Sequence, residues 1–372
     1  MSAPRVLVVG GGIAGLSAAW GLSRRGFAVE LFEQGPLPNP RASSHDEHRI
    51  IRHAYGELEG YAHMMPAAFR LWEALWAETG ARHYDDLPVI YFMRGETAWY
   101  EPTRRSLDRL GIAHAEIPLA EIPARFPMIE PAGLTRVMRT AGGGILYPVR
   151  ILTDLVKLLG RRGVALHANT RVEAIDAEAG TIRTAAGTVR GDAVIVAAGA
   201  WAARLVPSLA AAAVPSRQAV MFLAPPPELE AAWAAAPVMI DLGEESGTYT
   251  LPPRAGTRLK IGDHRFTRAG DPDGDRAGTD EDVARLLDAA SRAWRGFDRY
   301  TVLERKACFY TVTEDERFIL RREGARAWLC SACSGHGFKL GVLMGDAVAG
   351  AVAGERDAAS LTRWAAGLDI PD

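Results

Sequence analysis

The chain has 372 residues, of which 48% are hydrophobic and 24% charged, and its formal net charge is −2. This length and apolar content allow two domains with full cores, and the interspersed charges make neither nucleic acid nor an anionic membrane surface an expected partner. The N-terminus shows no basic leader, no apolar run approaches the roughly 18 residues of a membrane span, and the three cysteines lack a disulfide spacing. We therefore expect a cytoplasmic protein without membrane contact.

A glycine motif opens the chain. Residues 5–10 form an aliphatic run typical of a buried parallel strand, and Gly10, Gly12 and Gly15 follow as G-x-G-x-x-G before a helical apolar pattern. Gly10 permits the tight turn, Gly12 lets the backbone approach a pyrophosphate, and Gly15 lets the helix pack closely on the strand. A second strand ends in Glu33, 18 residues after Gly15, where it can bond ribose hydroxyls. The pattern predicts a dinucleotide-binding βαβ unit.

A later segment favours FAD over NAD as the dinucleotide. Residues 191–201 form another buried strand that ends in a glycine turn at Gly199. A plain nicotinamide dehydrogenase would have finished its dinucleotide domain much earlier, whereas amine-oxidising flavoproteins return to theirs at such a point.

The other predicted elements follow in chain order. Residues 36–53 form a polar loop, and 209–227 an Ala/Pro-rich surface connection. Helices are predicted over 60–80, 149–161 and 345–354, and strands over 89–93, 248–251 and 258–262.

We predict an α/β protein of two discontinuous domains. One is a Rossmann-like FAD-binding domain formed by residues 1–85, 145–213 and 300–372. The other carries an antiparallel sheet with the substrate pocket and is formed by residues 86–144 and 214–299.

Four clusters of side chains are candidates for chemistry. Arg49 and Arg52, separated by two isoleucines, suit an anion, although an exposed face is the simpler reading. Lys260 lies in a strand-like run before His264, and a strand lysine is most often an exposed edge residue. The third cluster is the glycine-flanked stretch that ends in Lys339. The fourth contains Cys308, which without a reactive partner would be a small apolar residue packed in the core.

Taken together, these motifs resemble one known family. They are the glycine loop, Ser44-His45 followed by residues 49–56, residues 259–264, residues 307–311 and residues 334–339. In order and spacing they resemble monomeric sarcosine oxidase and its relatives that oxidise N-methyltryptophan, pipecolate and fructosyl amino acids. The resemblance runs in register from the first strand to about Gly350.

The resemblance implies an FAD-dependent oxidase of a secondary amino acid, acting on a small amine and O2 and releasing H2O2. Cys308 matches the cysteine that forms a thioether to the flavin, so covalent FAD is expected. Arg52 and Lys339 match the pair that holds the substrate carboxylate, and Lys260 matches the lysine that activates oxygen through its positive charge. A monomer is expected by resemblance only.

The resemblance also assigns roles to residues around the flavin. His264 and Tyr249 match pocket residues near the amine, with Tyr310 in the substrate pocket, while Arg49 and His45 match residues beside the flavin. The expected cofactor contacts are Gly10, Gly12, Ile13, Gly15, Glu33, Ser44, Val172, Gly199, Cys308, Gly335, Gly337 and Lys339.

The chain departs from the family pattern at several positions. His48 replaces a threonine and Asp263 a tyrosine-like residue, while Arg317 and Arg321 stand where a histidine and an acid are usual, and these changes bear on substrate size. Cys330 and Cys333 form a C-x-x-C for which we expect no redox or metal role, and we expect no metal site.

Three alternative functions stay open: an oxidase of a cyclic or bulky amine, a flavin dehydrogenase with another acceptor, and a non-catalytic flavin protein.

Overall fold

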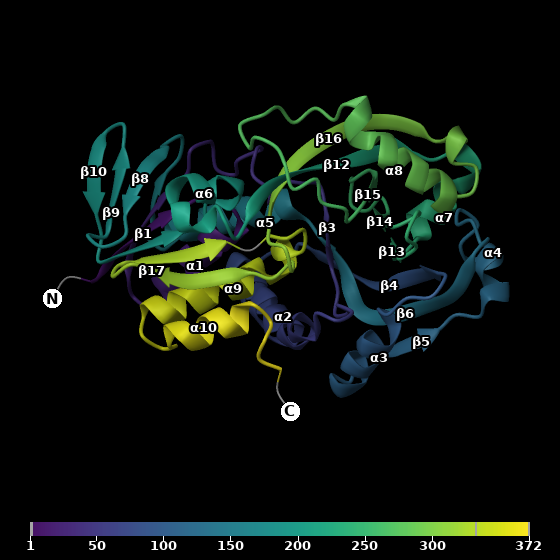
Figure 1. Ribbon diagram of the computed structural model, residues 1–372, viewed down its shortest axis with the longest axis horizontal. Coiled ribbons are helices and arrows are strands. Elements are labelled where there is room, and N and C mark those ends of the chain that lie inside the picture. Colours follow the sequence, from purple (N-terminus) through teal and green to yellow (C-terminus); the bar gives the residue numbers. More distant parts are fainter. Residues whose placement is uncertain (1–2, 332, 371–372) are drawn as a thin grey trace.

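The computed structural model describes residues 3–331 and 333–370, and its strands form two large sheets and a small one (Figure 1). The six-stranded sheet has the order β17-β18-β11-β1-β2-β7, and β7, β2, β1, β11 and β18 run parallel. Its strands are rich in β-branched and aliphatic residues because helices or hairpins cover both faces. They are β1 (Arg5–Val9), β2 (Ala28–Phe32), β7 (Ala165–His167), β11 (Ala193–Val196), β17 (Ile319–Glu323) and β18 (Ala327–Ser331).

One face of this sheet is covered by helices. α1 (Ile13–Arg24) packs against α9 (Gly337–Val352) and α5 (Pro148–Arg161), and α2 (Glu59–Thr79) and α10 (Ala358–Ala365) complete the layer (Figure 1). The other face packs against α6 (Ala202–Leu205) and a small sheet of β8 (Val172–Asp176), β9 (Thr181–Thr184) and β10 (Gly187–Arg190).

The nine-stranded sheet has the order β16-β12-β15-β14-β13-β4-β6-β3, with β5 paired to β6. All of these pairs are antiparallel except β13 with β4, so the predicted antiparallel sheet is confirmed apart from one pair. The strands are β3 (Arg49–Ile51), β4 (Tyr84–Arg94), β5 (His114–Glu116), β6 (Leu134–Leu146), β12 (Val214–Ala224), β13 (Val238–Asp241), β14 (Thr248–Leu251), β15 (Leu259–Gly262) and β16 (Thr301–Val312).

Helices also cover this sheet on both faces. α8 (Asp280–Ala293), α7 (Glu230–Ala235) and α4 (Ile122–Arg125) share one apolar cluster with the sheet, and α3 (Tyr100–Arg109) contributes to another. Short 3₁₀ turns are η1 (Leu119–Glu121), η2 (Gly199–Trp201), η3 (Pro207–Leu209), η4 (Pro227–Leu229) and η5 (Phe297–Arg299).

Three of the predicted elements are wrong. The segment 209–227 is not a surface connection, because it contains β12, which lies between β16 and β15; the inward-facing Ser216 and Gln218 conceal the apolar alternation of a strand. Helix α9 begins at Gly337 instead of residue 345, since the glycines of this stretch permit a helix that packs against α1. The polar segment 36–53 contains β3.

Sheet membership differs from the predicted division of the chain at two places. β3 and β16 lie within stretches assigned to the FAD-binding domain, yet they are hydrogen-bonded into the nine-stranded sheet. A division by sheet would therefore place residues 49–51 and 301–312 with the second domain.

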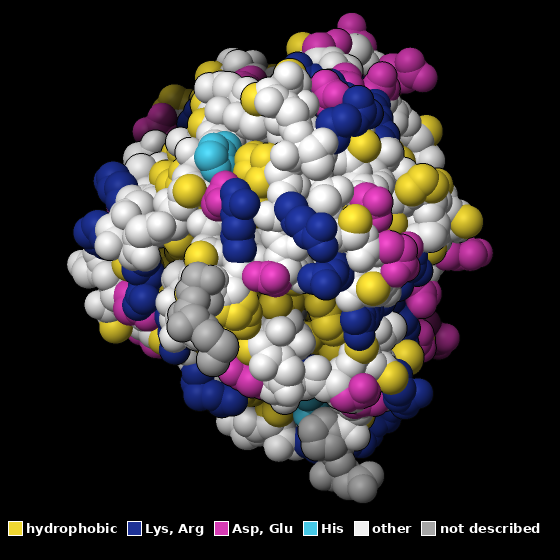
Figure 2. All heavy atoms as spheres, turned by 90° about the vertical axis from the view of Figure 1, so that its left-hand side faces the viewer, with side chains coloured by type: hydrophobic (Ala, Val, Ile, Leu, Met, Phe, Trp, Pro, Cys, Tyr) yellow, Lys and Arg dark blue, Asp and Glu magenta, His cyan; other side chains and the backbone are white. Residues whose placement is uncertain are grey.

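The surface carries charges of both signs. On the face that bears the N-terminal end, Lys and Arg side chains alternate with Asp and Glu, without a broad patch of one sign (Figure 2). In the part of the chain that the structure describes, no helix is long and apolar enough to cross a membrane.

Candidate active site

The glycine motif forms the floor of an elongated cavity, here called the nucleotide cavity, which encloses about 1300 Å³ including its open mouth. Gly10 has a φ of 110°, and a Cβ on it would lie 2.3 Å from the carbonyl oxygen of Ala197, directly after the neighbouring strand β11. The turn between β1 and α1 therefore requires glycine, and it brings Gly12 and Ile13 to the cavity wall. No acid occupies the first turn of α1, which leaves a helix N-terminus suited to a pyrophosphate.

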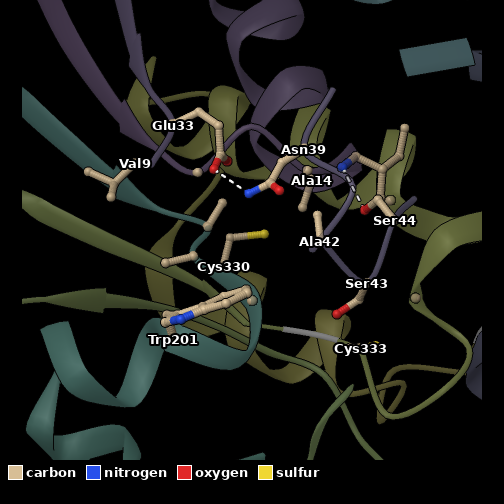
Figure 3. A pocket seen from close by; sticks show the side chains of 18 of the residues that line it. Val9, Ala14, Glu33, Asn39, Ala42, Ser43, Ser44, Trp201, Cys330 and Cys333 are labelled. Carbon is tan, nitrogen blue, oxygen red and sulfur yellow. Dashed lines mark hydrogen bonds between the residues drawn. The ribbon is translucent and has the colours of Figure 1, made fainter. Parts of the chain in front are cut away.

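Glu33 lies at one end of the nucleotide cavity, directly after β2. Its carboxylate accepts hydrogen bonds from the N–H groups of Gly11 (2.7 Å) and Gly35 (3.0 Å) and from Nδ2 of Asn39 (2.9 Å) (Figure 3). These donors hold the carboxylate at the wall, where a ribose would lie. Sequence reasoning missed Asn39, whose position only the loop after β2 determines.

Some of the other predicted cofactor contacts line the nucleotide cavity and others do not. Val172, Gly199, Ser44, Gly335 and Gly337 all line the nucleotide cavity, and Ser44 Oγ also accepts the N–H of Ile13 at 3.0 Å. Gly15 does not line it, because it packs behind the turn, where a Cβ would lie 1.9 Å from the oxygen of Gly10. Lys339, Cys308 and the flavin-side candidate His45 are also absent from its wall.

A second cavity lies between the nine-stranded sheet and the start of α9. It encloses about 1960 Å³ including its mouth. The predicted substrate and catalytic residues meet there, although they come from β3, β14, β15, β16 and α9 and the segments beside them: Arg49, Arg52, Tyr249, Lys260, His264, Tyr310 and Lys339. Sequence reasoning missed Trp99 and Glu316, which also line this cavity.

The two cavities adjoin each other. Arg49, Tyr310, Gly335 and Phe338 line both of them. A dinucleotide that extends from Glu33 past the glycine turn would therefore end where the second cavity begins, so its reactive end would face a molecule bound there.

Arg52 and Lys339 are two basic side chains on the wall of the second cavity. The Arg52 guanidinium lies 4.7 Å and the Lys339 Nζ 5.4 Å from the ring centre of Tyr55. Neither has a carboxylate partner among the described residues, and Nη1 of Arg52 is buried without any hydrogen bond. Burial and the neighbouring Arg52 lower the pKa of Lys339 well below its usual value. An anion bound between them would satisfy both groups.

Lys260 is fully buried and paired with an acid. Its Nζ lies 2.5 Å from Oδ2 of Asp46, and that oxygen lies 3.0 Å from Nη1 of Arg49. The edge-residue reading is wrong, because β15 lies between β12 and β14 inside the sheet. Burial lowers the pKa of Lys260 to about 8, with Asp46 opposing the shift.

The remaining polar candidates differ in how deeply their side chains are buried. Burial raises the pKa of both Tyr249 and Tyr310, so their hydroxyls stay protonated at neutral pH. His264 lies at the rim, with 49% of its side chain exposed and Nε2 3.0 Å from Oε2 of Glu316. His45 lies outside both walls, and burial and then Lys306 lower its pKa.

Cys308 lies on β16, two residues before Tyr310, so both side chains leave the same face of the strand. It lines neither cavity, although Tyr310 lines both. Burial raises the pKa of its thiol, while the charges of Arg49, Lys260 and Lys306 act in the opposite direction.

The departures from the family pattern lie away from the cavity walls. His48, Asp263, Arg317 and Arg321 line neither cavity. Asp263 pairs with Arg285 at 2.7 Å, and Arg317 donates to the carbonyl of Ala366.

The C-x-x-C cysteines lie at the nucleotide cavity. Cys330 and Cys333 both line its wall (Figure 3), and Ala332 between them lies outside the described residues. Within residues 3–331 and 333–370, no group of His, Cys, Asp and Glu is placed to hold a metal ion.

The fold and the paired cavities define a dinucleotide-binding protein of the doubly wound class, with a second cavity built on a large β-sheet. The chain belongs to the family of FAD dependent oxidoreductases, whose model matches residues 5–351.

Curated proteins and a solved structure are similar to the chain over most of its length, and the solved structure shares its fold. The chain is 29% identical to a monomeric sarcosine oxidase from a Bacillus species (92% of this chain, 90% of the relative) and 25% identical to an N-methyl-L-tryptophan oxidase from Yersinia pestis (92% and 93%). Among solved structures, NikD, an amino acid oxidase essential for nikkomycin biosynthesis, superposes with a TM-score of 0.81 at 20% identity, covering 96% of both chains.

Proposed function

We propose that this protein is a flavin-dependent oxidase of a secondary amino acid. The observation that carries the proposal is the junction of the two cavities: the nucleotide cavity meets, at Arg49 and Tyr310, a second cavity lined by the basic side chains Arg52 and Lys339, neither of which has a carboxylate partner among the described residues. The family and the sarcosine and N-methyltryptophan oxidases among the relatives support the same function.

FAD fits the residues present. The glycine turn, the free N-terminus of α1 and the carboxylate of Glu33 would hold its pyrophosphate and ribose, and the wall formed by Val172 and Gly199 would flank the remainder. When bound there, FAD supplies the two-electron acceptor that oxidises the amine to an imine and passes the electrons to O2, and the imine then hydrolyses.

The chain contributes binding, orientation and charge. Arg52 and Lys339 would hold the substrate carboxylate by charge-assisted hydrogen bonds, so that the amine points toward Tyr249 and the cavity junction. The protonated Lys260 would stabilise the negative charge that develops on oxygen, and Arg49 would stabilise negative charge on the reduced ring.

Covalent attachment through Cys308 is part of the proposal. Its support is the position of Cys308 on the same strand face as Tyr310, whose side chain lines both cavities. After acid precipitation, flavin colour should stay with the wild-type polypeptide and leave that of Cys308→Ala. Equal retention by both proteins would reject the attachment site.

A second candidate, an oxidase of a bulkier amine, is favoured by the size of the second cavity. Its wall extends from Lys260 to Trp99 and Glu316, and it has more lining residues than sarcosine, with its six heavy atoms, could contact. Trp99 supplies an aromatic surface at the distal end.

Peroxide release by the purified protein in air tests the function and separates the candidates. Sarcosine, N-methyltryptophan, pipecolate, proline and a fructosyl amino acid should be compared at one concentration, and a preference among them would name the substrate class. Bleaching of the flavin without air but no peroxide in air would replace the oxidase with a dehydrogenase. A flavin that no amine bleaches would reject the proposed substrate class.

We further propose that the enzyme is a cytoplasmic monomer. The three cysteines are free in the structure, as is usual in a reducing compartment, and the sarcosine oxidase among the relatives is described as monomeric. Sedimentation equilibrium and fractionation of the source cells test these two points.

A further inference from the structure

We propose that Asp46 is the counter-ion that keeps Lys260 protonated and holds its ammonium toward the second cavity, so that Asp46 determines the pH range in which the protein reacts with oxygen. This inference rests on the proposed oxidase function. Asp46 does not line either cavity, and it would act as a positioning residue through Lys260.

The geometry makes this pair unusually isolated from water. The side chain of Lys260 is 0% exposed and that of Asp46 5% exposed, and their charged atoms are 2.5 Å apart. The only other oxygen near Nζ among the described residues is the carbonyl of His48 at 3.4 Å. Asp46 is thus the one negative group that compensates the buried ammonium.

Most other ionisable groups around Lys260 do not favour its charge. Arg49 on β3 adds a second positive charge, and the ring of His48 is buried with neither nitrogen hydrogen-bonded, its pKa lowered to about 3 by burial and then by Lys260. Burial keeps the phenol of Tyr249 in its neutral form, and the centre of its ring lies 5.8 Å from Nζ of Lys260. The groups that face the pair are His45 and His48 from the segment before β3, Arg49 from β3, Tyr249 from β14, and Lys306 and Cys308 from β16.

The sign of the effect follows from these groups. Burial and Arg49 lower the pKa of Lys260, and Asp46 is the main group that raises it. Burial would raise the pKa of Asp46, but Lys260 and Arg49 hold it well below its usual range, so the acid stays charged at every working pH. Without Asp46, Lys260 would lose its proton at a lower pH than the present value of about 8.

The test compares flavin-loaded wild type with Asp46→Asn. In the wild type, the rate of reoxidation by oxygen should fall as pH rises through about 8, where Lys260 loses its proton. In Asp46→Asn the fall should occur at least one pH unit lower. A profile that stays in place, or a variant that reacts faster over the whole range, would overturn the proposal.

A second measurement does not depend on turnover. The visible absorption of the resting flavin should show a transition near the same pH, because a charge beside the ring disappears. It should be absent from Lys260→Met and should move to lower pH in Asp46→Asn. A transition that is unmoved, or one missing from the wild type between about pH 6 and 10, would also overturn the proposal.

Control variants separate this role from a structural one. Glu47→Gln removes the same charge one residue away, where the acid pairs with Arg258 instead of Lys260, and should leave both profiles unchanged. Asp46→Glu should restore the wild-type profile. If Asp46→Asn does not fold, Asp46→Ser, with a smaller neutral side chain, should give the same downward shift.

Variants made in Lys260→Met distinguish a failure of the proposed oxygen role of Lys260 from a failure of the proposed role of Asp46. There, adding Asp46→Asn should change neither profile further, and a further shift would show that Asp46 acts through Arg49, which overturns the inference. If Lys260→Met reoxidises at the wild-type rate, the oxygen role of Lys260 fails, while the absorption titrations of the wild type and Asp46→Asn still decide whether Asp46 keeps Lys260 protonated.

Discussion

At the scale of single residues, the proposed site depends on two basic side chains, Arg52 and Lys339, that have no carboxylate partner among the described residues. Arg52 follows β3 and Lys339 belongs to the first turn of α9, yet both lie over the ring of Tyr55. Two basic groups this close to one ring, with no carboxylate partner among the described residues, are costly to keep protonated, and a bound anion would remove that cost.

This arrangement predicts the effect of Arg52→Met. A charge-assisted hydrogen bond contributes about 1.5–3 kcal/mol, so kcat/KM for an amino acid substrate should fall roughly 10- to 100-fold. The primary amide of the same substrate, which lacks the carboxylate, should lose much less.

The matched control is Arg70→Met, which removes an exposed arginine on α2. It should leave both substrates unaffected. An equal loss for the acid and its amide in Arg52→Met would show that Arg52 does not bind the carboxylate.

At the scale of elements, the contact between α1 and α9 decides how the nucleotide cavity closes. A Cβ on Gly345 would lie 2.5 Å from Cβ of Ser17 and 2.6 Å from the nitrogen of Ala18, and one on Gly341 would lie 2.6 Å from Ile13. The helices approach this closely only because α9 has glycines on the side that faces α1. Ile13 and Gly341 also line the nucleotide cavity, so the spacing of these helices sets its width.

Gly345→Ala should therefore destabilise the protein. Overpacking of a close helix contact typically costs about 1–3 kcal/mol, and the displaced α1 should weaken flavin binding as well. Thermal unfolding followed by circular dichroism, together with the flavin content of the purified protein, measures both effects.

Gly160→Ala is the matched control for this substitution. Gly160 lies inside α5 with no atom within 4 Å of an added Cβ, so alanine should stabilise the protein by about 0.5–1 kcal/mol. If both variants lose stability to the same extent, the helix contact is not the cause.

At the scale of the whole molecule, the nucleotide cavity joins the two sheets. Tyr310 on β16 lines it from the nine-stranded side, and Trp201 lines it after β11 of the six-stranded sheet. A loop that precedes α8 reaches across: Asp273 accepts a hydrogen bond from the Trp201 indole at 2.7 Å, and Asp271 pairs with Arg204 at 2.5 Å. A bound flavin should therefore stabilise both sheets together.

Covalent attachment of the flavin can therefore be tested by measuring how added FAD changes the melting temperature of the protein. In Cys308→Ser the flavin would bind reversibly, so the melting temperature should rise with added FAD, equivalent to about 2.7 kcal/mol at a free concentration 100 times Kd. The wild type, with flavin attached, should not respond. Cys330→Ala, which removes a buried thiol that does line the nucleotide cavity, should behave like the wild type. A response to FAD in the wild type would argue against attachment.

Sequence reasoning succeeded where one local pattern suffices. The run from β1 through the glycine turn to α1 and β2 is specified by neighbouring residues, because burial on both faces selects aliphatic strands and the turn selects glycine. It failed for β12, since Ser216 and Gln218 face inward and hide the pattern, and for β15, which reads as an edge strand but lies inside the sheet.

The sequence by itself determined the dinucleotide-binding unit, the order of the motifs and the residue types available for chemistry. Only the tertiary structure decided which of them meet: it joined the two cavities at Arg49 and Tyr310, moved Gly15 behind the turn, and paired Lys260 with Asp46, 214 residues away. The physical reason is that turns and strands depend on neighbours in the chain, whereas the pairing of a buried charge depends on how distant segments pack.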